Sequence, residues 1–306
     1  MPELPEVETI VRTLRPFVTG RRIVDAELPS ANANGAGASI LRRILREPEW
    51  RVPSDFVSAI RGTLIQGVRR HGKHLVFDLG TSNGAKSPRC LLIHLGMTGR
   101  LTCETTPEPR SAHTHLVLSL DEPGRWIHYT DIRRFGRWQL FEASGEALRS
   151  LGPDPLEITF AEFAALLRSR RAMLKSLLLD QRFLRGLGNI YADESLFRAR
   201  IHPAVLAGRL TRQQARRLHW GIRETLRLAI AAGGSSIANY VDGLGNSGYF
   251  QHEHLVYRRT GEPCVRCGCR IRKMLIASRS THFCPRCQRL SRRVRKTARA
   301  SGRGVA

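Results

Sequence analysis

Long apolar runs and acidic residues are the features that this 306-residue sequence lacks most clearly. No apolar stretch approaches the ~20 residues of a membrane-spanning helix, which excludes a membrane protein. Asp and Glu number 26 against 50 Lys and Arg, so the formal net charge is +24 and the pI is about 11.2. The first ten residues, MPELPEVETI, contain neither a basic nor a long apolar segment, so we expect no secretion signal.

Cysteine is also scarce, with seven in the chain. Four of them form two CxxC pairs, which in a chain without an export signal indicates metal ligation and not disulfides. Hydrophobic residues make up 42% of the sequence, which excludes a disordered chain. The length predicts about two domains with real cores.

The positive charge is concentrated near the C-terminus. Glu262 is the last acidic residue, and residues 263–306 contain 13 Lys and Arg. A strongly basic protein usually binds a polyanion, and nucleic acid is the commonest one. A solvated tail explains 291–306 equally well, but it fits 263–287 less well because the charge there coincides with a metal motif.

Short apolar runs between turn residues predict strands over residues 60–142. Several alternate with period two, the pattern of an antiparallel sandwich or barrel. Residues 31–50 begin as a Gly/Ala/Asn-rich loop, which we interpret as a flexible insertion of unassigned function. The predicted strands are HLVFDL (74–79), LLIHL (91–95), HLVLSL (115–120), RWIHY (125–129) and RWQLFE (137–142).

Helical spacing replaces the strand pattern after a Pro-rich linker near residue 151. Two capping boxes, Thr159 with Glu162 and Thr211 with Gln214, predict helix starts. One apolar stripe indicates a helix packed on a core, with Gly233 as its C-cap. The stripe consists of Leu218, Ile222, Leu226, Ala229 and Ile230.

The two CxxC pairs, Cys264/Cys267 and Cys284/Cys287, have the spacing of a four-thiolate zinc site. Such a site has no open coordination position, so the metal should fold the unit and take no part in chemistry. Cys269, Cys90, Cys103 and His282 are expected to be inert neighbours or packing residues. The pairs bracket a predicted β-hairpin whose basic side chains could contact phosphate, namely Arg270, Arg272, Lys273 and Arg279.

The N-terminus could supply a nucleophile. Removal of the initiator methionine would leave Pro2 with a free secondary amine. An α-amino group titrates near ~8 against ~10.4 for Lys, so roughly a tenth of it is neutral at pH 7. Such an amine suits Schiff-base chemistry, and Glu3 and Glu6 lie beside it to move protons. An ordinary N-terminus is the alternative that composition alone favours.

Ten motifs occur in the order seen in one known family. The chain resembles bacterial formamidopyrimidine-DNA glycosylase, the 8-oxoguanine glycosylase/lyase family, from residue 1 to about 288. The motifs are MPELPEVET, HGKHLVFDL, HLGMTGRL, DIRRFGRW, LGPDPL, GLGNIYADESLF, HP (202–203), GYF (248–250), VYRRTGEPC and RSTHFCPRCQ.

The resemblance implies an α+β multidomain fold. Its parts are an N-terminal antiparallel β-sandwich catalytic domain (2–150), a helix-two-turn-helix domain (151–250), a four-cysteine zinc-finger β-hairpin (251–290) and a basic disordered tail (291–306). It also implies one structural Zn²⁺ as the only cofactor. Damaged double-stranded DNA is the implied partner, with no membrane partner, for a monomer in the bacterial cytoplasm at the nucleoid.

The same resemblance implies roles for the catalytic residues. Pro2 attacks C1′ of the damaged nucleotide, and Glu3 is the general acid for sugar-ring opening. Glu6 is a second acid near that site. Lys73 contacts phosphate and assists β-elimination. Arg279 grips the phosphates flanking the lesion and is tied to δ-elimination.

The resemblance further implies a set of DNA contacts. Met97, Arg133 and Phe135 are similar to the trio that fills the space left by a flipped nucleotide. Lys175 and Asn189 match phosphate-binding positions, and GLGN independently predicts a glycine turn opening a helix, whose N-terminal amides suit an anion. Further contacts are implied for His113, Arg134, Arg170 and Arg171.

Three features depart from the family, namely the added residues 31–50, Ile132 and the tail. Ile132 stands where the family usually has Pro. Residues 235–247 fall where the family has a mobile loop over the flipped base. The tail 289–306 extends past the usual end with seven basic residues, and we expect it to add non-specific DNA affinity.

The sequence therefore predicts a bifunctional glycosylase/AP lyase that removes oxidised purines, 8-oxoguanine and formamidopyrimidines, and nicks the strand by β,δ-elimination. One rival is an endonuclease VIII-like enzyme for oxidised pyrimidines, which typically has Gly at the position of Leu4. The other is a non-catalytic zinc-finger DNA-binding protein, which leaves Pro2, Glu3 and Glu6 unexplained.

Overall fold

The computed structural model describes residues 1–28, 53–80, 89–105, 111–142 and 150–290. The chain divides into two compact units, Met1–Ser150 with Ile230–Gln251, and Leu151–Ala229 with His252–Ala306. The predicted insertion (31–50) and the basic tail (291–306) lie outside the described residues. Within the described ranges, no helix is long and apolar enough to cross a membrane.

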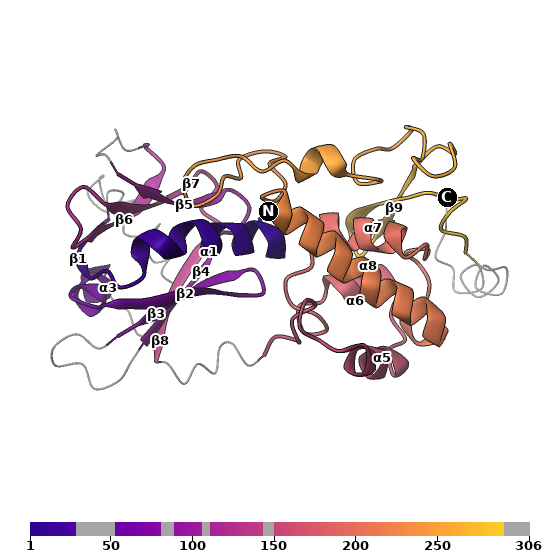
Figure 1. Ribbon diagram of the computed structural model, residues 1–306, viewed down its shortest axis with the longest axis horizontal. Helices are drawn as coiled ribbons and strands as arrows, with labels where there is room; N and C mark the ends of the chain where they lie inside the picture. Colours follow the sequence, from indigo (N-terminus) through magenta and orange to yellow (C-terminus); the bar gives the residue numbers. More distant parts are fainter. Residues whose placement is uncertain (29–52, 81–88, 106–110, 143–149, 291–306) are drawn as a thin grey trace. The chain divides into compact units, whose positions relative to one another are not determined.

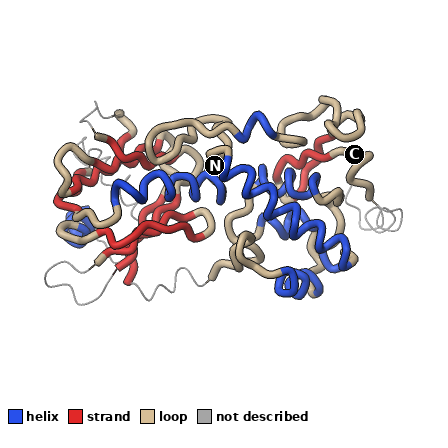
Figure 2. The backbone as a smooth tube through the Cα atoms, in the orientation of Figure 1, coloured by secondary structure: helices blue, strands red, loops and turns tan. Residues whose placement is uncertain are grey.

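The first unit is built on two four-stranded sheets, in which every strand pair is antiparallel (Figures 1 and 2). This confirms the predicted sandwich. One sheet has the order β1-β6-β7-β5, with bounds Ile23–Glu27, Thr114–Leu120, Trp126–Asp131 and Gly99–Glu104. The other has the order β2-β3-β4-β8, with bounds Ile65–His71, His74–Leu79, Arg89–His94 and Arg137–Glu142.

All five predicted runs are strands, but three further strands were not predicted. β5 (GRLTCE) alternates buried and partly buried residues as a half-buried strand should. β2 (IQGVRRH) contains a glycine and two arginines, which weaken its apolar alternation. A polar strand such as β2 is stabilised by its neighbours in the sheet, so its local pattern does not reveal it.

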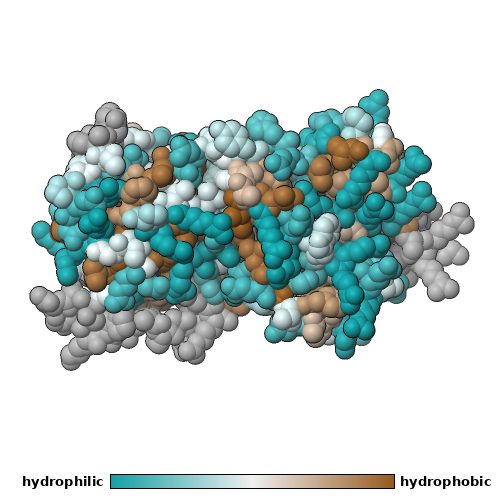
Figure 3. All heavy atoms as spheres, viewed as in Figure 1, coloured by the Kyte–Doolittle hydropathy of each residue, from teal (hydrophilic) through white to brown (hydrophobic). Residues whose placement is uncertain are grey.

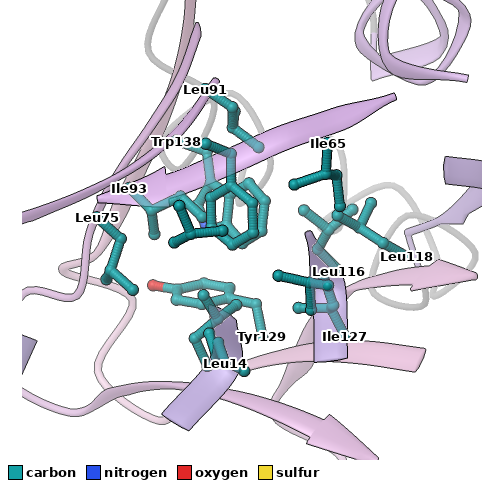
Figure 4. Packing of buried hydrophobic residues seen from close by; sticks show 14 of the residues in the cluster. Leu14, Ile65, Leu75, Leu91, Ile93, Leu116, Leu118, Ile127, Tyr129 and Trp138 are labelled. Atoms are coloured by element: carbon teal, nitrogen blue, oxygen red, sulfur yellow. The ribbon is translucent and has the colours of Figure 1, made fainter. Parts of the chain in front are cut away.

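The apolar core lies between the two sheets and is completed by two helices, α1 (Leu4–Val18) and α3 (Pro53–Ile60). Figure 4 shows Tyr129 and Trp138 at its centre, with ring centroids 5.3 Å apart in an edge-on arrangement. Such aromatic pairs add to the stabilisation that burial provides. α1 contributes Val7, Ile10 and Leu14 to this core, so the start of the chain is held on the sandwich.

The second unit contains the helices α5 to α7, most of α8, the 3-10 turn η2, the second half of the 3-10 turn η3 and a hairpin. Both predicted capping boxes are formed at the starts of α5 and α8. The predicted stripe on α8 is buried at Leu218, Ile222, Leu226 and Ala229. The bounds are α5 Phe160–Arg168, α6 Leu174–Leu179, α7 Asn189–Arg198, η2 Ala207–Arg209, α8 Arg212–Ala231 and η3 Phe250–Glu253.

The predicted hairpin between the cysteine pairs is formed by β9 (Arg272–Ile276) and β10 (Arg279–Phe283). Its two turn residues, Ala277 and Ser278, have φ values of 51° and 57°. Positive φ at both central residues gives a turn whose twist matches that of the paired strands. Arg279 therefore begins β10 directly after this turn.

Candidate functional site

The first residues of the chain form a buried acidic cap on α1. Glu3 is the N-cap residue, and its backbone N–H donates to Glu6 Oε2 at 2.8 Å in a capping box. The Glu3 and Glu6 side chains are 3% and 2% exposed, and Pro2 is also buried. The positive end of the helix dipole stabilises carboxylates at this position. Local helix capping thus fixes two carboxylates next to Pro2.

Glu6 also joins this cap to the segment that follows α8. Its Oε1 accepts a hydrogen bond from the Ser235 N–H at 2.8 Å. The Tyr240 hydroxyl donates to the carbonyls of Glu6 (3.3 Å) and Gly233 (3.0 Å). Burial, reinforced by the charge of Glu6, raises the pKa of Tyr240 above its ordinary value, so the hydroxyl remains a donor.

The same segment, in which we expected a mobile loop over residues 235–247, is closed by further hydrogen bonds. The Gly243 N–H donates to Thr13 Oγ1 at 2.9 Å, and its carbonyl accepts from the Cys103 N–H at 2.7 Å. Arg100 donates to the Asn239 carbonyl at 2.6 Å. In this structure, therefore, both α1 and β5 hold the loop.

Lys73 lies in the tight turn between β2 and β3 and is 8% exposed. Arg70, three residues earlier, pairs with Glu8 of α1 at 2.9 Å, which ties this hairpin to the helix that carries the N-terminal cap. His74 and His94 lie next to Lys73 on paired strands. Burial and nearby positive charge lower the pKa of His74 to about 4 and that of His94 to about 3, so both are neutral at pH 7.

Met97, Arg133 and Phe135 are brought together at the surface of the first unit. The side chains of Met97 and Phe135 are 44% and 46% exposed, which excludes core packing for either. The Arg133 guanidinium lies 4.6 Å from the centre of the Phe135 ring, and its Nη1 lies 3.4 Å from Met97 Sδ. The three predicted members of the trio thus form one exposed cluster, which we call the wedge.

The other two predicted contacts of this unit lie beside the wedge. The His113 carbonyl accepts from the Asp131 N–H at 3.0 Å. Arg134 is exposed and has a φ of 57°, a left-handed conformation that costs a non-glycine residue roughly 1–2 kcal/mol.

In the second unit, Lys175 is engaged inside the protein. It is 0% exposed, its Nζ lies 2.7 Å from Asp193 Oδ1, and it donates to the Ser280 carbonyl at 2.8 Å. It therefore joins α6 to α7 and to the hairpin, and its assignment as a phosphate contact stays a prediction. Asn189 opens α7 after Gly188, as the glycine turn predicted. Arg170 and Arg171 are exposed.

The four predicted cysteines form one metal site. Their sulfur atoms all lie within 4.8 Å of one another, with Cys264 and Cys287 at 3.9 Å and Cys267 and Cys284 at 3.5 Å. A tetrahedron with Zn–S bonds of about 2.3 Å has S···S edges of roughly 3.8 Å, so the set fits zinc. His282 does not join it, because its ring Nδ1 lies 3.1 Å from Asp193 Oδ2. Cys90 and Cys103 are buried, as expected.

Basic side chains are exposed on this unit. They include Arg279, at the start of β10, and Arg272 and Lys273 of β9. Hydrophilic residues predominate on the face seen in Figure 3. Several arginines of α8 are also exposed, namely Arg212, Arg216, Arg217 and Arg227. β9 and β10 contain no acidic residue and α8 contains one, the partly exposed Glu224, so these elements carry a surplus of positive charge.

Three buried carboxylates were missed by reasoning from sequence. Asp131, Asp193 and Glu194 are 0–1% exposed. Glu194 accepts from the consecutive N–H groups of Leu255, Val256 and Tyr257 at 2.9–3.0 Å, so it fixes the segment leading into the zinc finger. The sequence signal that could have identified them is their position. Asp131 ends a strand, and Asp193 and Glu194 lie within α7, where a buried carboxylate without partners would be costly.

Comparison with known families gives one consistent result along the chain. Residues 1–138 match the formamidopyrimidine-DNA glycosylase N-terminal domain, and residues 151–246 match the H2TH domain of the same enzyme. Residues 261–290 match the zinc finger found in FPG and IleRS. The domain boundaries predicted from the sequence, 2–150, 151–250 and 251–290, stay predictions. By packing, residues 230–251 belong to the first compact unit.

Individual proteins agree with the family models. The formamidopyrimidine-DNA glycosylase of Solibacter usitatus is 46% identical over 290 residues, covering 94% of this chain and all of that protein. Two solved structures of the Lactococcus lactis protein, each 35% identical, cover 94% of this chain and all of theirs. One is a mutant in complex with a Fapy-dG containing DNA (TM-score 0.81), and the other is a complex with an abasic site containing DNA (TM-score 0.80).

Proposed function

The chain belongs to the formamidopyrimidine-DNA glycosylase family, and we propose that it excises oxidised purines from duplex DNA with Pro2 as the attacking amine. It is a DNA glycosylase of base-excision repair with AP lyase activity, and it carries one structural zinc ion on four cysteines. No step of the proposed chemistry uses that ion, because four thiolates leave no open coordination position.

The proposed reaction begins when the neutral Pro2 amine attacks C1′ and the N-glycosidic bond breaks. The base leaves, the sugar ring opens with Glu3 donating a proton to the ring oxygen, and an iminium ion joins Pro2 to C1′. Loss of a proton from C2′ then expels the 3′ phosphate by β-elimination, and a second elimination expels the 5′ phosphate. Lys73 assists the β-elimination and Arg279 the second elimination. Hydrolysis of the iminium ion then frees the Pro2 amine.

The buried acidic cap is the observation that carries this proposal. Two carboxylates at 3% and 2% exposure adjoin Pro2, and helix capping and the Ser235 N–H hold one of them in place. A solvated N-terminus would give neither burial nor fixed orientation. Proton transfer requires a donor within hydrogen-bond reach of the reacting atom, and a pre-positioned cap provides one.

The proposal extends to DNA contacts. Flipping a damaged nucleotide costs a few kcal/mol, and an exposed cluster such as the wedge can fill the vacated space. Asn189, with Arg170, Arg171, His113 and Arg134, would hold phosphates on either side of the damaged nucleotide. We further propose a monomer acting in the bacterial cytoplasm at the nucleoid, which the bacterial origin of its relatives supports.

Borohydride trapping tests the nucleophile. The mature enzyme should become covalently bound to a duplex with one 8-oxoguanine, and peptide mapping should find the adduct on Pro2. Pro2→Gly should trap much less, whereas Pro5→Ala, in the first turn of the same helix, should trap like wild type. An adduct on a lysine, or retention of the initiator methionine in fully active enzyme, would overturn the proposal.

A panel of duplexes tests the substrate class. Each duplex carries one lesion, an oxidised purine or an oxidised pyrimidine, opposite each of the four bases, and gel analysis resolves the product ends. We expect fastest cleavage at oxidised purines, with phosphate left at both ends of the gap after β,δ-elimination. Faster cleavage at oxidised pyrimidines would favour the endonuclease VIII-like alternative, and binding without cleavage would favour a non-catalytic protein.

A further inference from the structure

Asp131 is a fully buried carboxylate directly before the loop 132–135, which carries two of the three wedge residues, Arg133 and Phe135. It is 0% exposed and ends β7. Its Oδ1 accepts from Thr98 Oγ1 at 2.5 Å and from the Arg133 N–H at 3.2 Å. Its Oδ2 accepts from the Tyr129 hydroxyl at 3.0 Å and from the Gly136 N–H at 2.8 Å. Four donors therefore converge on one side chain.

These hydrogen bonds close the loop from both ends. The Arg133 and Gly136 N–H groups bracket residues 133–135, which carry two of the wedge side chains, Arg133 and Phe135. Thr98, next to Met97, accepts from the Arg133 N–H at 3.1 Å while donating to Asp131. One carboxylate thus fixes the backbone that carries Arg133 and Phe135, and it binds the side chain of Thr98, the residue next to Met97.

The loop is strained, which makes the fixing necessary. Arg134 has a φ of 57°, and such a conformation persists in a non-glycine residue when surrounding bonds over-determine it. Packing is tight as well, because a Cβ on Gly136 would overlap the Tyr129 hydroxyl. Burial and the charge of Asp131 raise the pKa of Tyr129 above its ordinary value, so that hydroxyl stays protonated and donates.

Core stability alone does not account for this arrangement. Among the described residues, neutral hydroxyl and backbone N–H groups bind the buried Asp131 carboxylate, and no Lys or Arg forms an ion pair with it, an arrangement in which burying the charge is costly. An apolar residue would pack a strand end at lower cost. Two of the hydrogen bonds to Asp131 come from backbone N–H groups at the two ends of the exposed loop 133–135. This indicates that the loop needs a defined conformation.

We propose that Asp131 is a positioning residue that holds the wedge in the shape needed to enter the DNA stack. This inference rests on the proposed function. Asp131 touches neither the nucleotide nor Pro2 in this role, and it acts through Met97, Arg133 and Phe135. An asparagine cannot replace it, because its Nδ2 would face either the Arg133 or the Gly136 N–H, and two donors repel.

The experiment compares two steps with different needs for the wedge. Insertion into duplex is followed by 2-aminopurine fluorescence beside the lesion and by single-turnover excision of 8-oxoguanine. Schiff-base formation alone is followed by borohydride trapping on a single-stranded oligonucleotide with an abasic site, where there is no duplex stack to open. Wild-type trapping there tests the Pro2 chemistry separately, so failure of the proposed function is recognised independently of the variants.

Asp131→Asn should reduce the fluorescence change and slow duplex excision by about 10- to 100-fold, the equivalent of one or two lost hydrogen bonds to a charged group. Trapping on the single strand should stay within about twofold of wild type by the same scale. Equal losses in both assays would indicate general unfolding and overturn the proposal, as would wild-type rates in both.

A second pair of variants guards against a folding failure of Asp131→Asn. Thr98→Val removes the hydroxyl that links Asp131 to Arg133, while Thr98→Ser keeps it. We expect the valine variant to lose duplex excision and the fluorescence change selectively, and the serine variant to recover both. Equal duplex rates for the two variants would contradict a positioning role.

Discussion

Lys175 Nζ and Asp193 Oδ1 lie 2.7 Å apart, and neither side chain is exposed. The second oxygen of Asp193 accepts from the His282 N–H at 2.8 Å, and Lys175 donates to the Ser280 carbonyl. The pair therefore connects α6 and α7 to β10, the strand that begins at Arg279. Removing either member of a buried ion pair is strongly destabilising, because the other charge stays buried without its counter-charge.

Asp193→Ala should accordingly destabilise the second unit by about 3–5 kcal/mol, because it leaves a buried ammonium without its counter-charge. Urea unfolding followed by a probe in this unit, with zinc present, measures the loss. Glu262→Gln, which breaks the partly exposed pair with Arg259, is the control and should cost less than about 1 kcal/mol. If both variants unfold at the same urea concentration, the pair is not the link described.

The features that could be predicted were those that depend on residues close together in the sequence. Cysteine spacing gave the zinc site, alternation gave five strands, and the capping boxes gave two helix starts. Partnerships across the chain were not visible, because nothing local marks Glu6 as a partner of Ser235, 229 positions away, or Lys175 as a partner of Ser280. α1 was not predicted, because proline usually interrupts a helix, whereas Pro5 lies in the first turn of α1, where proline is tolerated.

His74 and His94 should make stability fall on acidification. Burial lowers the pKa of His74 to about 4 and that of His94 to about 3, against 6.5 for an ordinary histidine. Above pH 6.5 both are neutral in the folded and unfolded chain. As pH falls from 6.5 towards 4, the two histidines bind protons in the unfolded chain but stay neutral in the folded chain. The free energy of unfolding therefore falls, by up to about 1.4 kcal/mol for each unit by which a histidine pKa is lowered on folding.

The urea midpoint measured between pH 8 and pH 4.5 checks this expectation. His74→Gln combined with His94→Gln should flatten the decline between pH 6.5 and 4.5 relative to wild type. Between pH 7.5 and 8, where neither histidine titrates, the two curves should run parallel. An unchanged decline in the double variant would show that other groups cause it.

Removal of zinc should unfold the hairpin while the sandwich persists. The binding free energy of a four-thiolate site is folding free energy for a unit of this size. Hydrogen exchange after chelation should show loss of protection at the amides of β9 and β10, with β3 and β4 unaffected. Cys284→Ser should lose the metal, whereas Cys269→Ser should retain one zinc per chain, since Cys269 is outside the cluster. Protected β9 and β10 amides in the metal-free protein would contradict this dependence.

The basic tail should add salt-sensitive affinity. Residues 291–306 contain six Lys and Arg, and each phosphate neutralised contributes about −0.9 to the slope of log K against log salt for duplex DNA. A chain ending at residue 290 should bind undamaged duplex with a shallower slope, and one ending at residue 300, which loses a single arginine, should nearly retain it. Identical slopes would remove the tail from the binding surface.

Two glycines in the segment after α8 allow the effect of backbone strain to be measured separately from the effect of contact with the acidic cap. Gly234 and Gly245 have φ values of 82° and 86°, so alanine at either should cost roughly 1–2 kcal/mol. A Cβ at Gly234 would lie 3.1 Å from Glu6 Cγ and Oε1, whereas at Gly245 it would meet nothing within 4 Å. Both variants should lose similar stability, but only Gly234→Ala should also slow borohydride trapping, because it displaces Glu6 from the Ser235 N–H. Equal trapping by the two variants would show that the Pro2 chemistry does not depend on Glu6 being held by the Ser235 N–H.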